Sequence, residues 1–365
     1  MKAKIKSLIL KIFTREQIDL IIIFIDNFKL KRSYILSVVF SKNKFLSSVY
    51  YLFAGEFKRE NNAVLNGKRL HMKDLLEKKN NDYSLRRNIH RIEKGLLMKP
   101  RKDTFAIRFI EETMNNFIFL LNENNRVINN SQLKWAYDVL DEYYKVVGEH
   151  PIIDKQKSIF YNLEIEKNIT EEELRYIPYK RNLEYQSEIS FEGLKRLSTV
   201  RRSVRWFSNE PVDRNKIDKA LEIATLSPSA CNRQPYRYLI INDKDLLKKV
   251  VKLPSGTAGF GHNIPCLIAV IGDLSAYPFE RDRHLIYIDS SLSVMSFLYG
   301  LEVQELSSCV LNWPDIEKYE KKLEREINLK KYERVIMFIA VGNPDKDALV
   351  AYSRKKELSE LRQYI

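Results

Sequence analysis

Glycine is scarce in this chain, with 11 in 365 residues, well below an average usage of about 7%. Neither GxGxxG nor GxxxxGK[ST] occurs, so no glycine-rich loop that cradles phosphate is predicted. The nearest stretch, residues 256–261, has the wrong spacing and is better explained as an ordinary loop. Any phosphorylated ligand must therefore be held by other residue types.

Cysteine is also rare. Cys231, Cys266 and Cys309 are far apart, and no CxxC pair occurs. This argues against a disulfide framework or structural zinc and favours a reducing compartment, which we expect to be the cytoplasm. His90 and Glu93 share a helix face, but one such pair predicts a salt-bridged helix, not a metal site.

Long hydrophobic runs are missing too. The apolar stretch 18–25 contains Asp19 and is followed by Asp26, and no cleavage-site pattern follows, so no secretory signal is predicted. Residues 34–54 are apolar around Lys42, Asn43 and Lys44, whose charges would be costly in mid-bilayer. We expect a core or interfacial helix there, not a membrane span.

Positive charge is in excess, with 62 basic against 48 acidic residues and a net charge of +14. The two signs are interspersed along helical stretches, which is typical of solvated faces, and no nucleic-acid-binding motif is present. We therefore predict no nucleic-acid partner. A denser basic cluster within residues 86–102 is also expected to be solvated.

The two halves of the chain differ. Residues 1–190 predict mostly helices of unknown role, and glycine and proline stay sparse until Pro151 and Pro178. In residues 191–365, apolar runs predict buried strands at 238–241, 266–271 and 335–341. Asp213 is placed to cap a helix at 216–225, and another helix is expected at 289–299. The predicted class is α+β, a covered sheet preceded by a helical region.

Two polar clusters flank the helix at 216–225. In the first, Arg201, Ser203 and Arg205 alternate, so an extended segment would point them the same way, and Arg202 adds a third cation. Guanidinium groups offer a planar fork of donors that suits phosphate. Alone, the cluster would be better explained by surface salt bridges.

The second cluster is the proline-stiffened stretch 227–235, Ser-Pro-Ser-Ala-Cys-Asn-Arg-Gln-Pro. Ser229, Asn232 and Gln234 offer donors and acceptors that suit the edge of a flat, polar ring. The alternative is a helix-ending loop that only caps its neighbours. Because both clusters occur at this separation, we favour ligand binding.

These elements occur in a familiar order: RRSxRxF, PSxxNxQP, a helix led by Asp289, a Ser-Cys segment at 308–309 and a C-terminal Arg-Lys pair. Over the last half of the chain they resemble the nitroreductase family of FMN enzymes. The stretch His-Arg-Ile-Glu-Lys-Gly at 90–95, joined to such a domain, resembles a subgroup associated with surface-polysaccharide loci. The resemblance implies a mixed or antiparallel sheet covered by helices, and a homodimer with FMN at its interface.

The resemblance also implies roles for residues. Arg201 and Ser203 would hold the phosphate end of FMN, and Arg205 would lie near the ring edge. Asn263 and His262 are either flavin contacts or loop structure, and neither a catalytic side chain nor a metal is implied. The other implied cofactor-binding residues are Arg202, Pro228, Ser229, Ala230, Asn232, Gln234, Leu311, Asn312, Arg354 and Lys355.

Two functions follow. The leading hypothesis is an FMN-dependent oxidoreductase that transfers hydride from NADH or NADPH to a small conjugated acceptor, nitroaromatic- or quinone-like. The alternative is a flavin-binding scaffold or accessory protein of polysaccharide biosynthesis with little or no redox turnover. In that case residues 1–190 would dock onto a peripheral membrane or glycan-assembly partner. The sequence names neither the acceptor nor the preferred nicotinamide.

Overall fold

The structure is a computed structural model that describes residues 14–77, 81–167, 175–182, 184 and 187–365. Contacts between residues divide the chain into two compact units, Met1–Asn61 and Asn62–Ile365. The domain boundary near residue 190 that composition suggests stays a prediction. Within the described ranges, no helix is both long and apolar enough to cross a membrane.

The first unit consists mainly of α2 (Arg15–Phe40) and α3 (Lys44–Ala54). Thr14 begins α2 with a capping box, and the Asn43 side chain caps α3 by accepting the N–H of Leu46. Gly55 ends α3 at φ 75°, a left-handed conformation that glycine adopts without strain. The stretch 34–54 therefore contains a break at 41–43, and none of its residues is buried. A core helix there is therefore excluded, and the interfacial alternative stays a prediction.

The second unit begins with a helical region. Helices α5 (Asp82–Leu96), α6 (Ile110–Glu123), α7 (Ser131–Val146) and α8 (Pro151–Tyr161) share one apolar core. Asn81 and Asn130 cap α5 and α7 with their side chains. Two short strands pair in parallel: β1 (Val127–Ile128), between α6 and α7, and β2 (Glu166–Lys167), after α8. The mostly helical character expected before residue 190 is confirmed for the described residues.

Helix α4 (Lys58–Leu76) packs on the segment Leu274–Ala276, a short 3-10 helix later in the chain. Ala63 packs in a buried cluster with Leu274, Ala276 and Ile286. The approach is close, because a Cβ added at Gly67 would lie 2.7 Å from the Leu274 backbone. Glycine is required at this contact for steric reasons.

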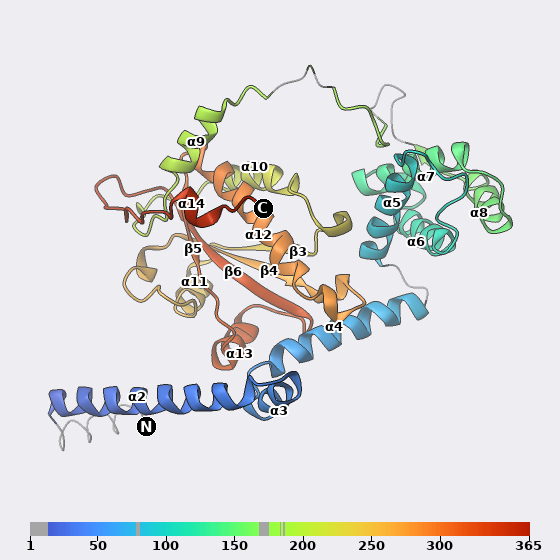
Figure 1. The fold of residues 1–365 in the computed structure, drawn as a ribbon. Helices are drawn as coiled ribbons and strands as arrows, with labels where there is room; N and C mark the ends of the chain where they lie inside the picture. The colour runs from blue at the N-terminus through green and yellow to red at the C-terminus, as the bar shows by residue number, and fades with distance from the viewer. Residues whose placement is uncertain (1–13, 78–80, 168–174, 183, 185–186) are drawn as a thin grey trace. The chain divides into compact units, whose positions relative to one another are not determined.

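The later residues form an antiparallel sheet of order β3-β4-β6-β5 (Figure 1). Its strands are β3 (Tyr236–Ile241), β4 (Cys266–Asp273), β5 (Ser307–Leu311) and β6 (Glu333–Gly342). The three expected strands correspond to β3, β4 and β6, and the α+β class is confirmed. Strand β5 was not expected from the sequence, because Ser307 and Ser308 are small and polar although they are buried where β5 pairs with β6.

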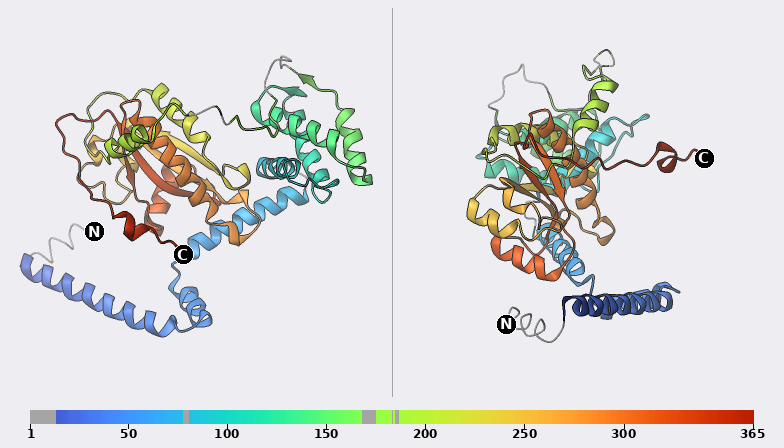
Figure 2. Two further views of the ribbon diagram at one scale, coloured as in Figure 1. Left: turned by 45° about the horizontal axis from the view of Figure 1, so that its top comes forward. Right: turned by 90° about the vertical axis from the view of Figure 1, so that its left-hand side faces the viewer.

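The sheet lies between helices on its two faces (Figures 1 and 2). Side chains of the central strands alternate between two apolar layers. Leu267, Ala269 and Phe338 face α11 (Lys244–Val250) and α13 (Glu317–Glu326). Ile268 and Val270 face α10 (Arg214–Thr225) and α12 (Leu285–Glu302). Asp213 caps α10 by accepting the N–H of Asn215, as expected. The chain also contains α9 (Phe191–Val200) and α14 (Leu358–Leu361).

Candidate functional site

The first polar cluster begins where α9 ends. Ser190 caps this helix, and Arg201 leaves it with extended backbone angles, φ −60° and ψ 118°. The Val204 N–H then donates to the Ser308 carbonyl at 3.0 Å, so Ser203 lies beside β5 in a parallel bridge. Val204 is buried while Ser203 and Arg205 are exposed. The burial of Val204 therefore fixes which side the polar residues occupy.

Arginine charge gathers around the middle of β5. Burial raises the pKa of the Cys309 thiol, while the positive charges of Arg205 and Arg201 oppose that rise. Burial likewise raises the pKa of Glu302, and Arg201 opposes it. Arg201 thus lies within electrostatic reach of both β5 and the end of α12. This corner has an excess of cations over carboxylates.

The C-terminal segment joins the same corner. An Nη atom of Arg202 donates to the Tyr352 carbonyl at 3.2 Å. Arg354 and Lys355 follow two and three residues later and are exposed. Arg354 pairs with Glu357 on its own segment. The structure therefore brings the backbone next to the predicted basic pair into contact with the first cluster.

The exit of β5 supplies Leu311 and Asn312. Leu311 is buried as the last residue of the strand, and the Asn312 side chain is exposed. The Asn312 carbonyl accepts the N–H of Ser255 at 3.1 Å, which ties this exit to the loop before β4. The predicted residues at 311 and 312 are therefore adjacent in sequence but differ in exposure.

The second polar cluster folds as a strained turn. Cys231, Asn232 and Gln234 have φ values of 53°, 52° and 50°, although none of them is glycine. The Ser229 hydroxyl accepts the N–H of Gln234 at 2.9 Å. Asp289 accepts the N–H of Ala230 at 2.9 Å. The resemblance implied that Asp289 heads a helix, but α12 starts at Leu285. Asp289 therefore lies inside α12 and holds this turn by its bond to Ala230.

An arginine of the helical region binds the second cluster, which the sequence did not predict. Arg86 on α5 donates from Nε to the Asn232 carbonyl at 2.7 Å and from Nη to Gln234 Oε1 at 2.9 Å. Gln234 donates in turn to the Thr225 carbonyl. Its carboxamide is therefore engaged at both ends within one chain. The expectation that the whole basic cluster of residues 86–102 is solvated is wrong for Arg86.

Further cations surround this turn. Arg87 and Arg91 lie within electrostatic reach of Cys231 and Arg233. Arg87 pairs with Glu112 at 2.9 Å, and Arg233 is 8% exposed with its guanidinium 4.8 Å from the Tyr277 ring centre. The signal available in the sequence was the density of arginines on α5, where positions 86, 87 and 91 are all arginine. Nearby, Glu93 lies 3.6 Å from His90 and accepts from Trp135, and no metal-ligand cluster occurs among the described residues.

The two clusters are not joined within one chain. No hydrogen bond, ion pair or ring contact of the described residues links residues 201–205 to residues 228–234. The Asn263 side chain accepts the N–H of Phe207 and donates to the Arg205 carbonyl, at 2.8 and 3.1 Å. Asn263 therefore shapes the first cluster, and its polar atoms are used by backbone.

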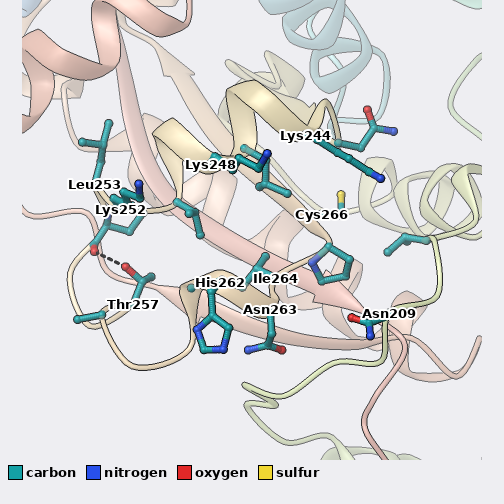
Figure 3. Close-up of a pocket in the computed structure, with 18 of the residues that line it drawn as sticks. Asn209, Lys244, Lys248, Lys252, Leu253, Thr257, His262, Asn263, Ile264 and Cys266 are labelled. Carbon is teal, nitrogen blue, oxygen red and sulfur yellow. Dashed lines mark hydrogen bonds between the residues drawn. The ribbon is translucent and has the colours of Figure 1, made fainter.

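Two pockets border these clusters. The larger, about 1470 Å³, lies between α11 and the loop before β4, and exposed Lys244, Lys248 and Lys252 line it (Figure 3). None of the thirteen predicted cofactor residues lines it, although Asn263 does. The smaller, about 370 Å³, is lined by Gln234 together with Arg86 and Arg233. The thirteen predicted residues thus lie outside the large pocket, and Gln234 lines the smaller one.

Comparisons with known proteins cover part of the chain. A family model described as Nitroreductase family matches residues 199–258. The iodotyrosine deiodinase of Danio rerio is 32% identical over 222 residues, which span 52% of this chain and 74% of that protein. The oxygen-insensitive NADPH nitroreductase of Helicobacter pylori is 24% identical over 186 residues, 41% of this chain and 87% of that protein. The structure of an FMN-dependent nitroreductase from Clostridium difficile aligns with a TM-score of 0.38 and 21% identity, over 43% and 91% of the two chains.

Proposed function

Because the chain belongs to the nitroreductase family, we propose that it is an FMN-dependent oxidoreductase that reduces a small conjugated acceptor, nitroaromatic- or quinone-like, with NADH or NADPH. One observation carries the proposal. Hydrogen bonds link the first cluster to Ser308 of β5 and to the Tyr352 backbone beside the C-terminal basic pair. Elements separated by more than a hundred residues therefore meet at one corner, which supports a phosphate site there.

The donor set fits the phosphate of FMN. Arg201, Arg202 and Arg205 form no ion pair within 4.0 Å with any other described residue, so their charges stay available to an anion. Ser203 adds an exposed hydroxyl. When bound, FMN supplies the hydride chemistry. Arg205 would place a positive charge near the ring edge, which favours acceptance of electrons there.

We also propose a homodimer, since one chain leaves the two clusters apart. Helix α12 exposes Ile288, Leu292 and Met295 on one face at helical spacing, next to the second cluster. Leu226, at the end of α10, is 84% exposed. An apolar surface of this kind favours a second copy, whose turn at 228–234 would line the ring opposite the first cluster.

The thiols support a reducing location, which we propose to be the cytoplasm. Cys231, Cys266 and Cys309 are all free. Burial raises the pKa of Cys266 to about 12, so that thiol stays protonated and unreactive at neutral pH. The arrangement needs no disulfide.

Absorbance spectroscopy of the full-length protein tests the function. We expect bound flavin that bleaches when NADH or NADPH is added without oxygen and regains its colour when an acceptor follows. The acceptors should include a nitrobenzene, a benzoquinone and 3-iodotyrosine, the last because relatives are iodotyrosine deiodinases. A colourless protein that takes up no FMN would contradict the proposal. Bound FMN that NADH or NADPH does not bleach, with no acceptor turned over, would instead favour the accessory, flavin-binding role.

The phosphate site has its own test. Arg201→Gln should weaken FMN binding about tenfold to a hundredfold, because a charge-assisted bond to an anion contributes about 1.5–3 kcal/mol. Lys248→Gln is the matched control, since it removes an exposed cation that lines the large pocket. Fluorescence titration of apoprotein with FMN gives both constants. Equal affinities for the two variants would remove Arg201 from the site.

A further inference from the structure

The first unit exposes its apolar side chains. None of the described residues of α2 or α3 is buried, and none belongs to any of the chain's hydrophobic core clusters. Phe24 is 73% exposed, Leu52 is 72% exposed and Phe53 is 80% exposed. Apolar surface of this extent on a soluble domain marks an interaction site.

The exposed groups of α2 are ordered by face. Leu20, Phe24, Phe28, Ile35 and Val39 recur at intervals of four and seven residues, so they share one stripe. The opposite face carries Asp19, Asp26, Ser33 and Ser37, also at intervals of seven and four. Both aspartates of α2 are therefore turned away from the apolar stripe, while exposed Ile22 and Leu30 share their face, so apolar surface extends beyond the stripe.

Positive charge accompanies this apolar surface. The first 61 residues contain twelve Lys or Arg and five Asp or Glu, a net charge of +7 and half of the chain's +14. Lys31 lies within the apolar stripe, seven residues after Phe24, and Arg32 lies at its edge. Lys42 and Lys44 lie at the connection to α3. Long basic side chains of this kind bury their stems and keep their charge in the headgroup region.

We propose that the first unit is a monotopic anchor that lies along the surface of an anionic lipid bilayer, with the apolar stripe of α2 at the acyl boundary. Charged residues inside α2 prevent it from spanning the bilayer, which agrees with the lack of a spanning helix among the described residues. A second copy is a poor occupant, because it would bring +7 against +7. An anionic lipid surface complements both the charge and the apolar area.

Flotation of the full-length protein with vesicles tests the anchor. With mixed phosphatidylcholine and phosphatidylglycerol, the floated fraction should exceed that with phosphatidylcholine alone by at least about tenfold. Phe24→Glu combined with Phe28→Glu should lower flotation on the mixed vesicles by about tenfold or more, because it removes apolar insertion.

The matched control adds the same two charges to the polar face, as Ser33→Glu with Ser37→Glu, and should lose less than about threefold. Far-UV circular dichroism checks that both variants keep their helices. If wild type stays with neither vesicle, or if both variants lose flotation equally, the proposal is overturned. It is also overturned if wild type forms lipid-independent oligomers that only the phenylalanine variant dissolves, since a second copy would then cover the stripe.

Discussion

At the scale of single residues, the turn at 228–234 departs most from what its sequence suggests. Cys231, Asn232 and Gln234 have positive φ angles although none of them is glycine. Each such backbone conformation costs about 1–3 kcal/mol. Bonds from Ser229 and Arg86 hold the turn. The proline and asparagine content predicted a stiff polar loop. It could not predict the left-handed geometry, because that depends on partners far away in sequence.

His71 leads to a pH prediction. It is fully buried on α4, and its Nδ1 lies 2.8 Å from the Ser275 carbonyl, which requires a proton on that nitrogen. Burial lowers the pKa of His71 below 6.5. The unfolded chain therefore takes up a proton that the folded chain refuses as pH falls below about 6.5, and stability is lost. The free energy of unfolding should fall between pH 7 and 5, by at most about 1.4 kcal/mol per pH unit from this group.

His71→Asn is the comparison, because it keeps a donor near Ser275 but does not titrate. Urea unfolding at pH 7 and pH 5 gives the difference between the two proteins. If the variant loses stability with acid as steeply as wild type, His71 is not the responsible group. His71 contacts Ser275, and Tyr277 packs in the same cluster as Ala63 of α4. The measured difference therefore also reports on the stability of the contact between α4 and residues 274–277.

At the scale of elements, the packing of α10 on α12 depends on one glycine. A Cβ added at Gly300 would lie 2.9 Å from the Ala220 Cα and 3.1 Å from its Cβ. Gly300→Ala should lower the free energy of unfolding by about 1–3 kcal/mol through overpacking. Helix propensity acts in the opposite direction by about 1 kcal/mol at most, so the steric effect should win.

Gly193→Ala in α9 is the matched control, since it is exposed and its nearest neighbour would be the Ser190 hydroxyl at 3.4 Å. That variant should be neutral or slightly stabilised in the same denaturant titration. Greater stability of Gly300→Ala than of wild type would show that the helices separate easily.

Element prediction succeeded where local signals were strong. The Asp213 cap corresponds to the start of α10, and the apolar runs correspond to three strands. Strand β5 was missed because Ser307 and Ser308 look like loop residues until β6 pairs with them. The first cluster was identified by its arginines, but its place beside β5 depends on a bridge between residues 203 and 308. Local sequence carries no information about such a pairing.

At the scale of the whole molecule, the proposed dimer can be tested through α12. Leu292→Glu should weaken association by at least about tenfold, because a carboxylate would be buried in an apolar contact. Light scattering across protein concentrations measures this, and FMN content should fall with the dimer. Leu65→Glu on α4 is the control, since Leu65 is 62% exposed and lies on another element. A dimer that survives Leu292→Glu unchanged would place the interface elsewhere.

The contact between α5 and the second cluster also bears on modularity. Arg86 lies 146 residues before Asn232, yet it donates to that residue's carbonyl and to the side chain of Gln234. A truncated protein that starts at residue 187 would keep the strained turn and lose two of the bonds that hold it. The sheet domain therefore cannot be transferred to another protein on its own with this turn fully bonded. A functional exchange has to include α5 together with the turn that Arg86 binds.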